Sequence, residues 1–375
     1  MLDNIPVFIS DFSLVTPLGF GIKENFENLL NGQSGLQILQ DDRFFNEALP
    51  FSKIDDKIIS DAQNQFNVNT RFDALLLKCA NQLLQNCSID LSSKDCLIIL
   101  STTKGNIELM ASDAHDQRLY LGYSAALIQQ HFNNPNKPLI ISNACISGVS
   151  AMIVAKRLVE TKKYHHVVVI GCDVLSHFVI SGFHSFHALS KEICKPFDAQ
   201  RNGINLGEAC AALVISNENN SEISLHGGCV SNDANHISGP SKTGEELAYC
   251  VQTSLQNASL QAKDIDFISA HGTATEYNDE MESKAFDLSD VHTSPVFSLK
   301  AMYGHTLGAS GLLEAIIAAE CLKRNIILPS YGYSNKGVSG NIFVSDTLQH
   351  KPLKHAIKTG SGFGGCNAAI ILSKV

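Results

Sequence analysis

A cysteine on an expected sharp turn is the first residue whose position suits covalent chemistry. Cys145 lies in the segment Ser142-Asn-Ala-Cys-Ile-Ser-Gly148, between a strand-like run and a stretch with helical spacing. Backbone N–H groups at a helix start favour negative charge, and this environment lowers the pKa of a thiol. Cys145 is therefore a candidate nucleophile, although a buried structural cysteine explains the segment equally well.

Two histidine segments in the second half of the chain are further candidates. His271 opens the run His271-Gly-Thr-Ala-Thr after an expected strand, and Lys300 and His305 occupy a glycine-rich loop before a helical, almost wholly apolar stretch. Glu314 lies in that stretch, where a carboxylate is costly unless it is paired, so Lys300 is its expected partner. With 14 histidines in the chain, a surface or core role explains any single one, and a structural ion pair explains Lys300 and Glu314.

The chain closes with a glycine-rich segment between two strand-like runs, Gly360-Ser-Gly-Phe-Gly-Gly365. Glycines let a backbone approach a substrate closely, and the N–H groups of such a segment could stabilise an oxyanion. A tight turn between two strands explains the same residues.

These residues need a scaffold, and the spacing of apolar residues predicts alternating strands and helices. A buried strand is expected at 138–142, and further strands at 166–170, 265–269 and 295–299. Helices are expected at 149–159, 279–287 and 312–322. The alternation predicts α/β layers, and its recurrence predicts two related halves packed face to face. We place the division near residues 215–224, which gives an N-terminal half of residues 1–217 and a C-terminal half of residues 218–375.

The composition indicates a globular protein with a large core, because 44% of the 375 residues are hydrophobic. The net charge of −9 disfavours nucleic acid as a partner, and no apolar run is long enough to cross a bilayer. The N-terminus lacks the pattern of a signal peptide, so a cytoplasmic location is expected. The 11 cysteines include no CxxC pair, and neither a disulfide framework nor a metal site is expected.

Taken together and in this order, the motifs resemble those of the β-ketoacyl-[acyl carrier protein] synthases of the elongating, Cys-His-His type, in the thiolase-fold superfamily. The resemblance runs over nearly the whole chain. It includes three further segments, Leu14-Val-Thr-Pro-Leu-Gly19, Lys195-Pro-Phe-Asp-Ala-Gln-Arg-Asn-Gly-Ile-Asn-Leu-Gly-Glu208 and Ser231-Asn-Asp-Ala-Asn-His236. It implies a thiolase-like α/β fold in which two related halves form a layered αβαβα architecture.

The resemblance implies a role for each candidate residue. Cys145 becomes the acylated nucleophile, and His271 and His305 bind the carbonyl of the extender thioester and promote its decarboxylation. Lys300 holds the electrostatics of the site, with Glu314 as its partner.

Further residues receive supporting roles from the same resemblance. Asp279 braces the loop of the first histidine. The backbone N–H groups of Cys145 and Phe363 form the oxyanion hole, and the Phe363 ring is a gate over the nucleophile. Arg71 and Arg201 align with the family's docking surface for its carrier protein, although ordinary solvated charge explains them nearly as well.

The implied reaction is a decarboxylative Claisen condensation of the enzyme-bound acyl chain with a malonyl-acyl carrier protein, which gives a β-ketoacyl-acyl carrier protein. It needs no cofactor. The implied partners are the acyl carrier protein and a second synthase chain, in a homodimer or in a heterodimer with a related synthase.

Several residues depart from the family pattern. Asn143 stands where Thr or Ser is common, and Cys366 stands where Thr is usual. Residues 101–107 differ from the usual glycine-rich version, in a region that lines the acyl pocket of the family. An unusual acyl chain, and with it a specialised polyene or polyketide pathway, is therefore expected as an option beside fatty-acid elongation.

Two related classes of protein are the alternatives. Priming synthases that accept acyl-CoA carry Cys-His-Asn, and the second histidine motif argues against that class. Chain-length-factor-like subunits are non-catalytic partners that typically lose the cysteine. The chain keeps Cys145, His271 and His305, which argues for an enzyme.

Overall fold

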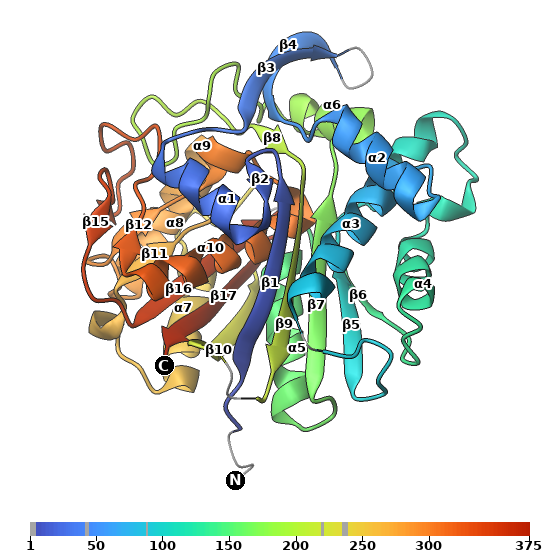
Figure 1. The fold of residues 1–375 in the computed structure, drawn as a ribbon. Coiled ribbons are helices and arrows are strands. Elements are labelled where there is room, and N and C mark those ends of the chain that lie inside the picture. Colours follow the sequence, from blue (N-terminus) through green and yellow to red (C-terminus); the bar gives the residue numbers. More distant parts are fainter. Residues whose placement is uncertain (1–4, 42–44, 88, 219–220, 235–238) are drawn as a thin grey trace.

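One sheet composed of two matching parts runs through the molecule (Figure 1). In this computed structural model, the described residues are 5–41, 45–87, 89–218, 221–234 and 239–375. Asn235 and His236, which end the segment that starts at Ser231, lie outside the described residues.

Each part of the sheet contains five strands in the same arrangement. The first part comprises β1 (Phe8–Thr16), β5 (Cys96–Ser101), β6 (Leu139–Ile141), β7 (His166–Asp173) and β9 (Ala209–Ser216). The second part comprises β10 (Ile223–Asn232), β11 (Phe267–Ser269), β12 (Pro295–Phe297), β16 (His355–Gly362) and β17 (Cys366–Lys374), and β14 (Phe343–Val344) extends it beyond β12.

The two parts repeat one topology. Their spatial orders are β6-β5-β7-β9-β1 and β12-β11-β16-β17-β10. The first to fifth strands along the chain of one part therefore occupy the same positions in the sheet as the first to fifth strands of the other part. The parallel and antiparallel pairs also correspond. The parts join where β1 pairs with β10, with Phe8 opposite Ser224. The expectation of two related halves is confirmed.

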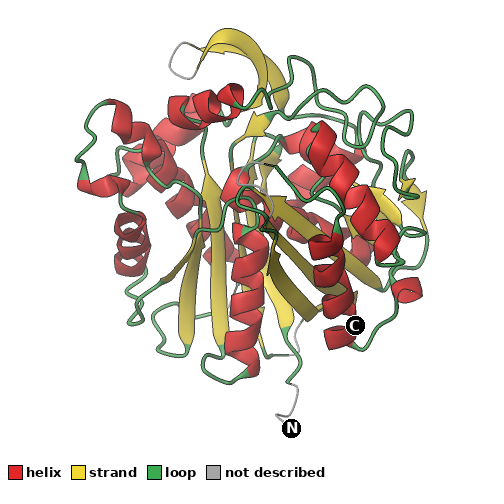
Figure 2. Ribbon diagram, turned by 180° about the vertical axis from the view of Figure 1, so that it is seen from behind, coloured by secondary structure: helices red, strands yellow, loops and turns green. Residues whose placement is uncertain are grey.

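Helices lie between the two parts and on their outer faces (Figure 2). α5 (Ser147–Glu160) and α10 (Ser310–Arg324) contact strands of both parts and form the central layer. α3 (Arg71–Asn86) covers the outer face of the first part, and α7 (Glu245–Ala258), backed by α8 (Glu276–Leu288), covers that of the second. The layers therefore follow the αβαβα order that the resemblance implies.

The remaining elements are short or peripheral. They are the helices α1 (Gly21–Leu30), α2 (Asp56–Phe66), α4 (Leu121–His131), α6 (His177–Ser185) and α9 (Lys300–Tyr303), the 3-10 turns η1 (Ile107–Ala111), η2 (Gln117–Leu119), η3 (Ala262–Asp264) and η4 (Leu307–Ala309), and the strands β2 (Gly19–Phe20), β3 (Leu36–Asp41), β4 (Phe45–Ser52), β8 (Leu206–Gly207), β13 (Ile326–Ile327) and β15 (Gln349–His350). Strands β3, β4 and β8 form a separate small sheet, which rises from the top of the molecule in Figure 1.

Two glycines determine how closely the central helices cross. A Cβ atom on Gly148 would lie 2.6 Å from the backbone nitrogen of Leu312, and one on Gly311 would lie 2.7 Å from a methyl carbon of Val149. Real Cβ atoms do not approach other atoms so closely, so both positions need glycine. The crossing brings the start of α5, next to Cys145, against the start of α10.

The predicted helices and strands are all present within a few residues of their expected bounds. One detail is wrong. Residues 138–142 were expected to form a buried strand, but β6 is the edge strand of the sheet and Leu139 is 39% exposed. An apolar strand at an edge has the pattern of a buried one, because sequence spacing does not show what lies beside it. No helix in the described ranges combines the length and apolar character needed to cross a bilayer.

Candidate active site

Cys145 lies on the turn between β6 and α5. The residue before it, Ala144, has a φ of +43°, which is unusual for any residue but glycine. The turn ends where the N–H of Asn143 donates to the hydroxyl of Ser147 at 2.8 Å. Cys145 itself is 8% exposed, so little of the residue is open to solvent.

His271 follows the end of β11 on a loop that two carboxylates of α8 hold in place. Glu282 accepts from the backbone N–H of His271 at 2.9 Å and from that of Gly272 at 2.6 Å. Asp279 accepts from the N–H of Ala274 at 3.1 Å, and Ala274 again has a positive φ, of +61°. The structure thus places Asp279 against the His271 loop, and it adds Glu282, which the sequence did not reveal.

His305 lies between α9 and η4, with its backbone N–H donating to the carbonyl of Asn205 at 2.7 Å. It is 1% exposed, and neither of its ring nitrogens has a hydrogen-bond partner among the described residues. Leu307, two residues on, has a φ of +51°. Each of the three site loops therefore contains one non-glycine residue in the left-handed region, and such local strain often occurs at functional sites.

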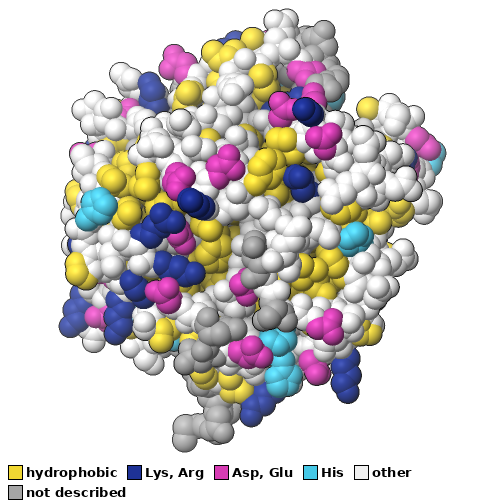
Figure 3. Space-filling view, in the orientation of Figure 1, with side chains coloured by type: hydrophobic (Ala, Val, Ile, Leu, Met, Phe, Trp, Pro, Cys, Tyr) yellow, Lys and Arg dark blue, Asp and Glu magenta, His cyan; other side chains and the backbone are white. Residues whose placement is uncertain are grey.

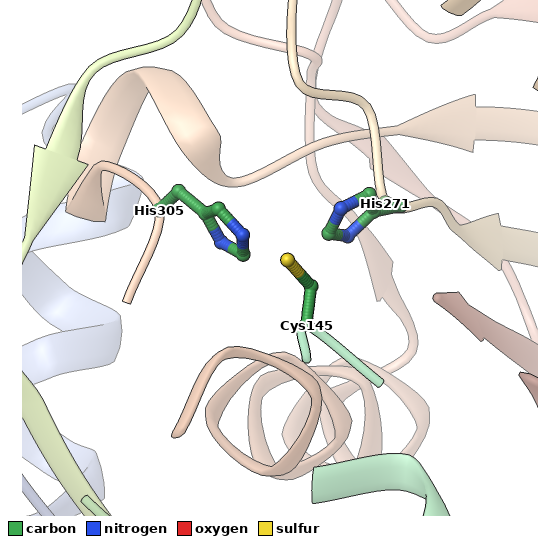
Figure 4. Close-up of side chains that lie close together, drawn as sticks. All are labelled: Cys145, His271 and His305. Atoms are coloured by element: carbon green, nitrogen blue, oxygen red, sulfur yellow. The ribbon is translucent and has the colours of Figure 1, made fainter. Parts of the chain in front are cut away.

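The three side chains point toward one another (Figure 4). The sulfur of Cys145 and one ring nitrogen each of His271 and His305 lie within 4.8 Å of one another. The two imidazole rings pack edge to face, with centroids 5.1 Å apart. The structure therefore brings together the three residues that the sequence predicts for the reaction centre.

A buried charged cluster supports the histidines from behind. Lys300 is paired with Glu314, as expected, and its ammonium group also donates to the carbonyl of His271 at 2.9 Å. Lys358, on β16, lies 2.7 Å from the second carboxylate oxygen of Glu314. All three side chains are at most 3% exposed. The sequence analysis missed Lys358, although a lysine inside an apolar strand is the signal that could have revealed it.

Burial, together with the charged cluster, keeps the imidazoles neutral at neutral pH. Burial lowers the pKa of His271 and of His305 well below the usual value, and the positive charge of Lys300 lowers both further. For Glu314, burial alone would raise the pKa, but Lys300 and Lys358 outweigh it, and the pKa is lowered. Each neutral imidazole carries one N–H donor, which can hold a developing negative charge.

The thiol of Cys145 differs from the sequence-based expectation. Burial, followed by the neighbouring thiol of Cys366, raises its pKa to about 12, whereas Lys300 and the N–H of Phe363 act in the opposite direction. The expectation of a lowered pKa is wrong, because removal of the thiolate from water outweighs the nearby positive groups. The thiol enters any reaction protonated, and the imidazoles beside it can accept its proton.

The backbone around Phe363 adjoins the nucleophile. A side chain on Gly362 would lie 2.9 Å from the backbone nitrogen of Cys145, so the end of β16 approaches the turn closely. The Phe363 ring is 37% exposed and packs on Phe183 at a centroid distance of 5.4 Å. The N–H of Phe363 reaches the sulfur of Cys145, and Phe363 lines both cavities that open onto this sulfur. Cys366 is buried, and its thiol donates to the carbonyl of Phe363.

Two cavities meet at Cys145. The larger, of about 490 Å³, contains both imidazoles and reaches Arg201 and Tyr277. The smaller, of about 170 Å³, is apolar, and its walls include Thr103, Gly182 and Phe183. A thiol between a small apolar pocket and a wider cavity suits the transfer of an apolar chain from one carrier to another.

The two arginines predicted for carrier docking have different surroundings. Arg71 has only 12% of its side chain exposed, because its guanidinium group pairs with the buried Glu208 at 2.6 Å and with Asp56 at 2.8 Å. Arg201 lines the larger cavity, and its guanidinium group donates to the carbonyl of Glu276 at 3.3 Å. The structure thus brings Arg201 to the entrance of the site and places Arg71 in an ion-pair network.

Comparison with known proteins identifies the family. The model of the β-ketoacyl synthase N-terminal domain matches residues 5–221, and that of the β-ketoacyl synthase C-terminal domain matches residues 223–334. Two similar relatives are proteins named 3-oxoacyl-[acyl-carrier-protein] synthase 2. The one from Staphylococcus aureus is 25% identical over 100% of this chain and 99% of its own length, and the one from Rhizobium meliloti is 30% identical over 66% and 62%.

A solved structure agrees with these relatives. A chain in the complex of a ketosynthase with its chain length factor from Xenorhabdus doucetiae is 25% identical, with a TM-score of 0.88 over 99% of this chain and 98% of that one. The residues that the two domain models match include all three residues of the reaction centre. The chain therefore belongs to the β-ketoacyl synthase family.

Proposed function

We propose that the chain catalyses the decarboxylative condensation of a Cys145-bound acyl group with a malonyl thioester on an acyl carrier protein. One observation carries the proposal: a buried thiol and two neutral imidazoles converge between an apolar pocket and a wider entrance. The relatives named 3-oxoacyl-[acyl-carrier-protein] synthase 2 support the same reaction and the same carrier.

In the first step, the sulfur of Cys145 attacks the thioester carbonyl of the acyl carrier. A C–S bond forms to Cys145, the bond to the carrier sulfur breaks, and the thiol proton passes through a neighbouring imidazole to the leaving carrier thiolate. The carbonyl oxygen carries negative charge in between, and we assign its stabilisation to the N–H groups of Cys145 and Phe363. The hydrogen bond from the N–H of Phe363 to the sulfur and the close approach of Gly362 to the backbone nitrogen of Cys145 support this assignment.

In the second step, the malonyl group loses CO₂ and its C–C bonding electrons form an enolate. The N–H groups of His271 and His305 hold the enolate oxygen, and no external base is needed because loss of CO₂ generates the carbanion. The enolate carbon then attacks the acyl-Cys145 carbonyl. A C–C bond forms, the sulfur of Cys145 leaves and regains a proton, and the β-ketoacyl carrier is released.

The proposed partners are an acyl carrier protein and a second synthase chain. The ketosynthase from Xenorhabdus doucetiae was solved with its chain length factor, which supports either a homodimer or a heterodimer here. For the carrier we propose Arg201, at the cavity entrance, as a docking residue. Negative net charge does not preclude such docking, because Lys and Arg side chains gather locally, for example on the left of the face in Figure 3.

The pathway and location are also proposals. Residues Thr103 and Lys104, in the segment that departs from the family pattern, line the apolar pocket. This placement supports a specialised acyl chain, as in polyene or polyketide synthesis, beside fatty-acid elongation. We propose the cytoplasm as the location, because carrier thioesters are water-soluble substrates. The alternative of a non-catalytic partner subunit is disfavoured by the assembled reaction centre.

The proposal is tested by incubation with a medium-chain acyl carrier protein, followed by intact and peptide mass spectrometry. The acyl mass is expected on Cys145 in the wild type. The Cys145→Ala variant, which lacks only the sulfur, is expected to remain unmodified. An unmodified wild-type protein, or an adduct on another cysteine only, would refute the enzyme assignment.

A further inference from the structure

Lys358 is a buried charged residue that the condensation mechanism above does not use. It lies in the middle of β16, between the buried Ile357 and Thr359, and its side chain is 0% exposed. Removing an ammonium group from water is costly, so a lysine survives at such a place only when it is fully partnered or has a task.

The partners of Lys358 all lie behind the reaction centre. Its ammonium group donates to the carbonyls of Ser269 and Ala270, at 3.1 Å each. It also lies 2.7 Å from Oε2 of Glu314, within ion-pair distance.

Lys358 and Lys300 divide one set of acceptors between them. Lys358 takes the carbonyls of Ser269 and Ala270, and Lys300 takes the next one, that of His271. Two ammonium groups thus donate hydrogen bonds to three successive carbonyls at the end of β11. Each lysine also faces one oxygen of the Glu314 carboxylate. Two positive charges share one direct counter-charge.

We propose that Lys358 is a second positioning lysine, which fixes the strand end that carries His271 and keeps positive charge behind both imidazoles during decarboxylation. The inference rests on the proposed function, because it assigns Lys358 to the decarboxylation step. Lys358 touches neither substrate nor reacting atom, so it acts through the two histidines.

The charges around the imidazoles determine what removal of Lys358 should do. The groups that face His271 and His305 are Lys300 from α9, Lys358 from β16 and Cys145 from the turn before α5, and the carboxylates behind them are Glu314 from α10 and Glu282 and Asp279 from α8. Both lysines lower the pKa of both imidazoles.

Loss of the Lys358 charge leaves the surroundings of both imidazoles less positive, because the carboxylates behind them remain. The pKa of each imidazole should rise, and a protonated pair no longer offers the arrangement of donors and neutral nitrogens that the enolate step needs. The low-pH limb of the decarboxylation rate should therefore move to higher pH. Acyl transfer to Cys145 passes the thiol proton through one of the same imidazoles, so its acid limb should move in the same direction.

The test compares Lys358→Met, which removes the charge at similar length, with Lys358→Arg, which keeps it. Malonyl-carrier decarboxylation is measured from pH 5 to 8, together with acylation of Cys145 by mass spectrometry, after circular dichroism has checked the fold. In the Met variant, the acid limb is expected to move up by about one pH unit and the rate at low pH to fall about tenfold. The Arg variant should keep the wild-type acid limb.

Two further arms keep the result decisive. If Lys358→Met does not fold, Lys358→Gln, which can still donate to a carbonyl, replaces it as the uncharged variant. The reaction of the histidines with diethyl pyrocarbonate at different pH values reports their pKa without any substrate. A wild-type acid limb and wild-type histidine reactivity in the uncharged variants would overturn the inference. A wild-type enzyme without decarboxylation would instead refute the proposed function, while the histidine reactivity still tests the role of Lys358.

Discussion

At the residue scale, the site contains two kinds of buried polar group. Some have ionic or hydrogen-bond partners within the protein, and others have none among the described residues. Lys300, Lys358 and Glu314 satisfy one another and the end of β11. The ring nitrogens of His305, in contrast, have no partner among the described residues. Unpartnered polar atoms are costly in a core, so they are typical of places where a substrate supplies the missing partner.

Asp279 allows a pH-dependent test of how the His271 loop is held. Burial raises the pKa of this carboxyl from 3.8 to about 7, against the hydrogen bond from the N–H of Phe197. At a pH between these two pKa values, the carboxyl of Asp279 is protonated in the folded state and ionised in the unfolded state. Binding of this proton stabilises the folded state at low pH, and the stabilisation is lost as the pH rises toward 7.

The Asp279→Asn variant should lack that dependence. Relative to the variant, the free energy of unfolding of the wild type is expected to fall by roughly 1–3 kcal/mol between pH 5 and pH 8. Chemical denaturation of both proteins across this range measures the difference. A difference that is constant with pH would show that Asp279 is ionised throughout.

Which site residues could be predicted depends on how local their signals are. Cys145, His271 and His305 each lie in a contiguous motif, and the order of the motifs identifies them. Glu282 binds backbone N–H groups and stands in no motif, so only the structure reveals it. For Lys358, a lysine inside an apolar strand is a signal in the sequence, but its contact with Glu314 comes from the structure. The pKa of Cys145 was predicted in the wrong direction, since sequence shows the helix start but not the depth of burial.

At the element scale, the crossing of α5 and α10 positions the nucleophile. The Gly148→Ala substitution would place a Cβ atom 2.6 Å from the backbone of Leu312 and push the helices apart. We expect a loss of stability of about 1–3 kcal/mol and slower acylation of Cys145. Gly122→Ala on α4, where an added Cβ meets nothing within 4 Å, is the matched control and should be neutral or slightly stabilising. Equal melting temperatures and acylation rates for the two variants would contradict this account.

Helix α6 forms one wall of the apolar pocket and offers a test of the acyl chain's location. A Cβ atom on Gly182 meets nothing within 4 Å, so a larger side chain there can extend into the cavity of about 170 Å³. Gly182→Leu is expected to lower kcat/KM at least tenfold for carrier proteins that bear long acyl chains, and less for carrier proteins that bear short ones. Gly182→Ala is the control. An unchanged chain-length profile would place the acyl chain elsewhere.

Secondary structure was predictable because the apolar periodicity of the central elements is strong. Helix α10 is buried all round and β7 is a continuous apolar run, and both patterns are typical of the inside of an α/β protein. The neighbours of each strand were less predictable. The edge position of β6 depends on the pairing of β5 with both β6 and β7, which no local pattern encodes.

At the scale of the whole molecule, the edge strand β6 is a place where a second chain could pair. Leu139 on β6 is 39% exposed, and Tyr120 and Tyr123, beside the start of α4, are 67% and 41% exposed. An uncovered sheet edge with apolar neighbours favours association between chains.

We expect two chains per particle, either of this protein alone or with a related synthase. Light scattering on the purified protein should give twice the mass of the chain if the dimer is homomeric, and Leu139→Lys should shift the mass to that of a monomer. The exposed Ile38→Lys on β3, away from this edge, is the control and should leave the mass unchanged. A monomeric wild type that stays monomeric with co-expressed synthases would contradict the expectation.

A condensation differs from acyl transfer alone, because it joins the two acyl units through a new C–C bond. The most direct measurement is a single turnover in which protein acylated on Cys145 is mixed with malonyl-acyl carrier protein, and the carrier-bound products are weighed. We expect the acyl group to leave Cys145 while CO₂ and a β-ketoacyl carrier appear in equal amounts. The β-ketoacyl chain should be two carbons longer than the starting acyl chain. Release of the acyl group as free acid, or its return to the carrier without any β-keto product, would contradict the proposed condensation.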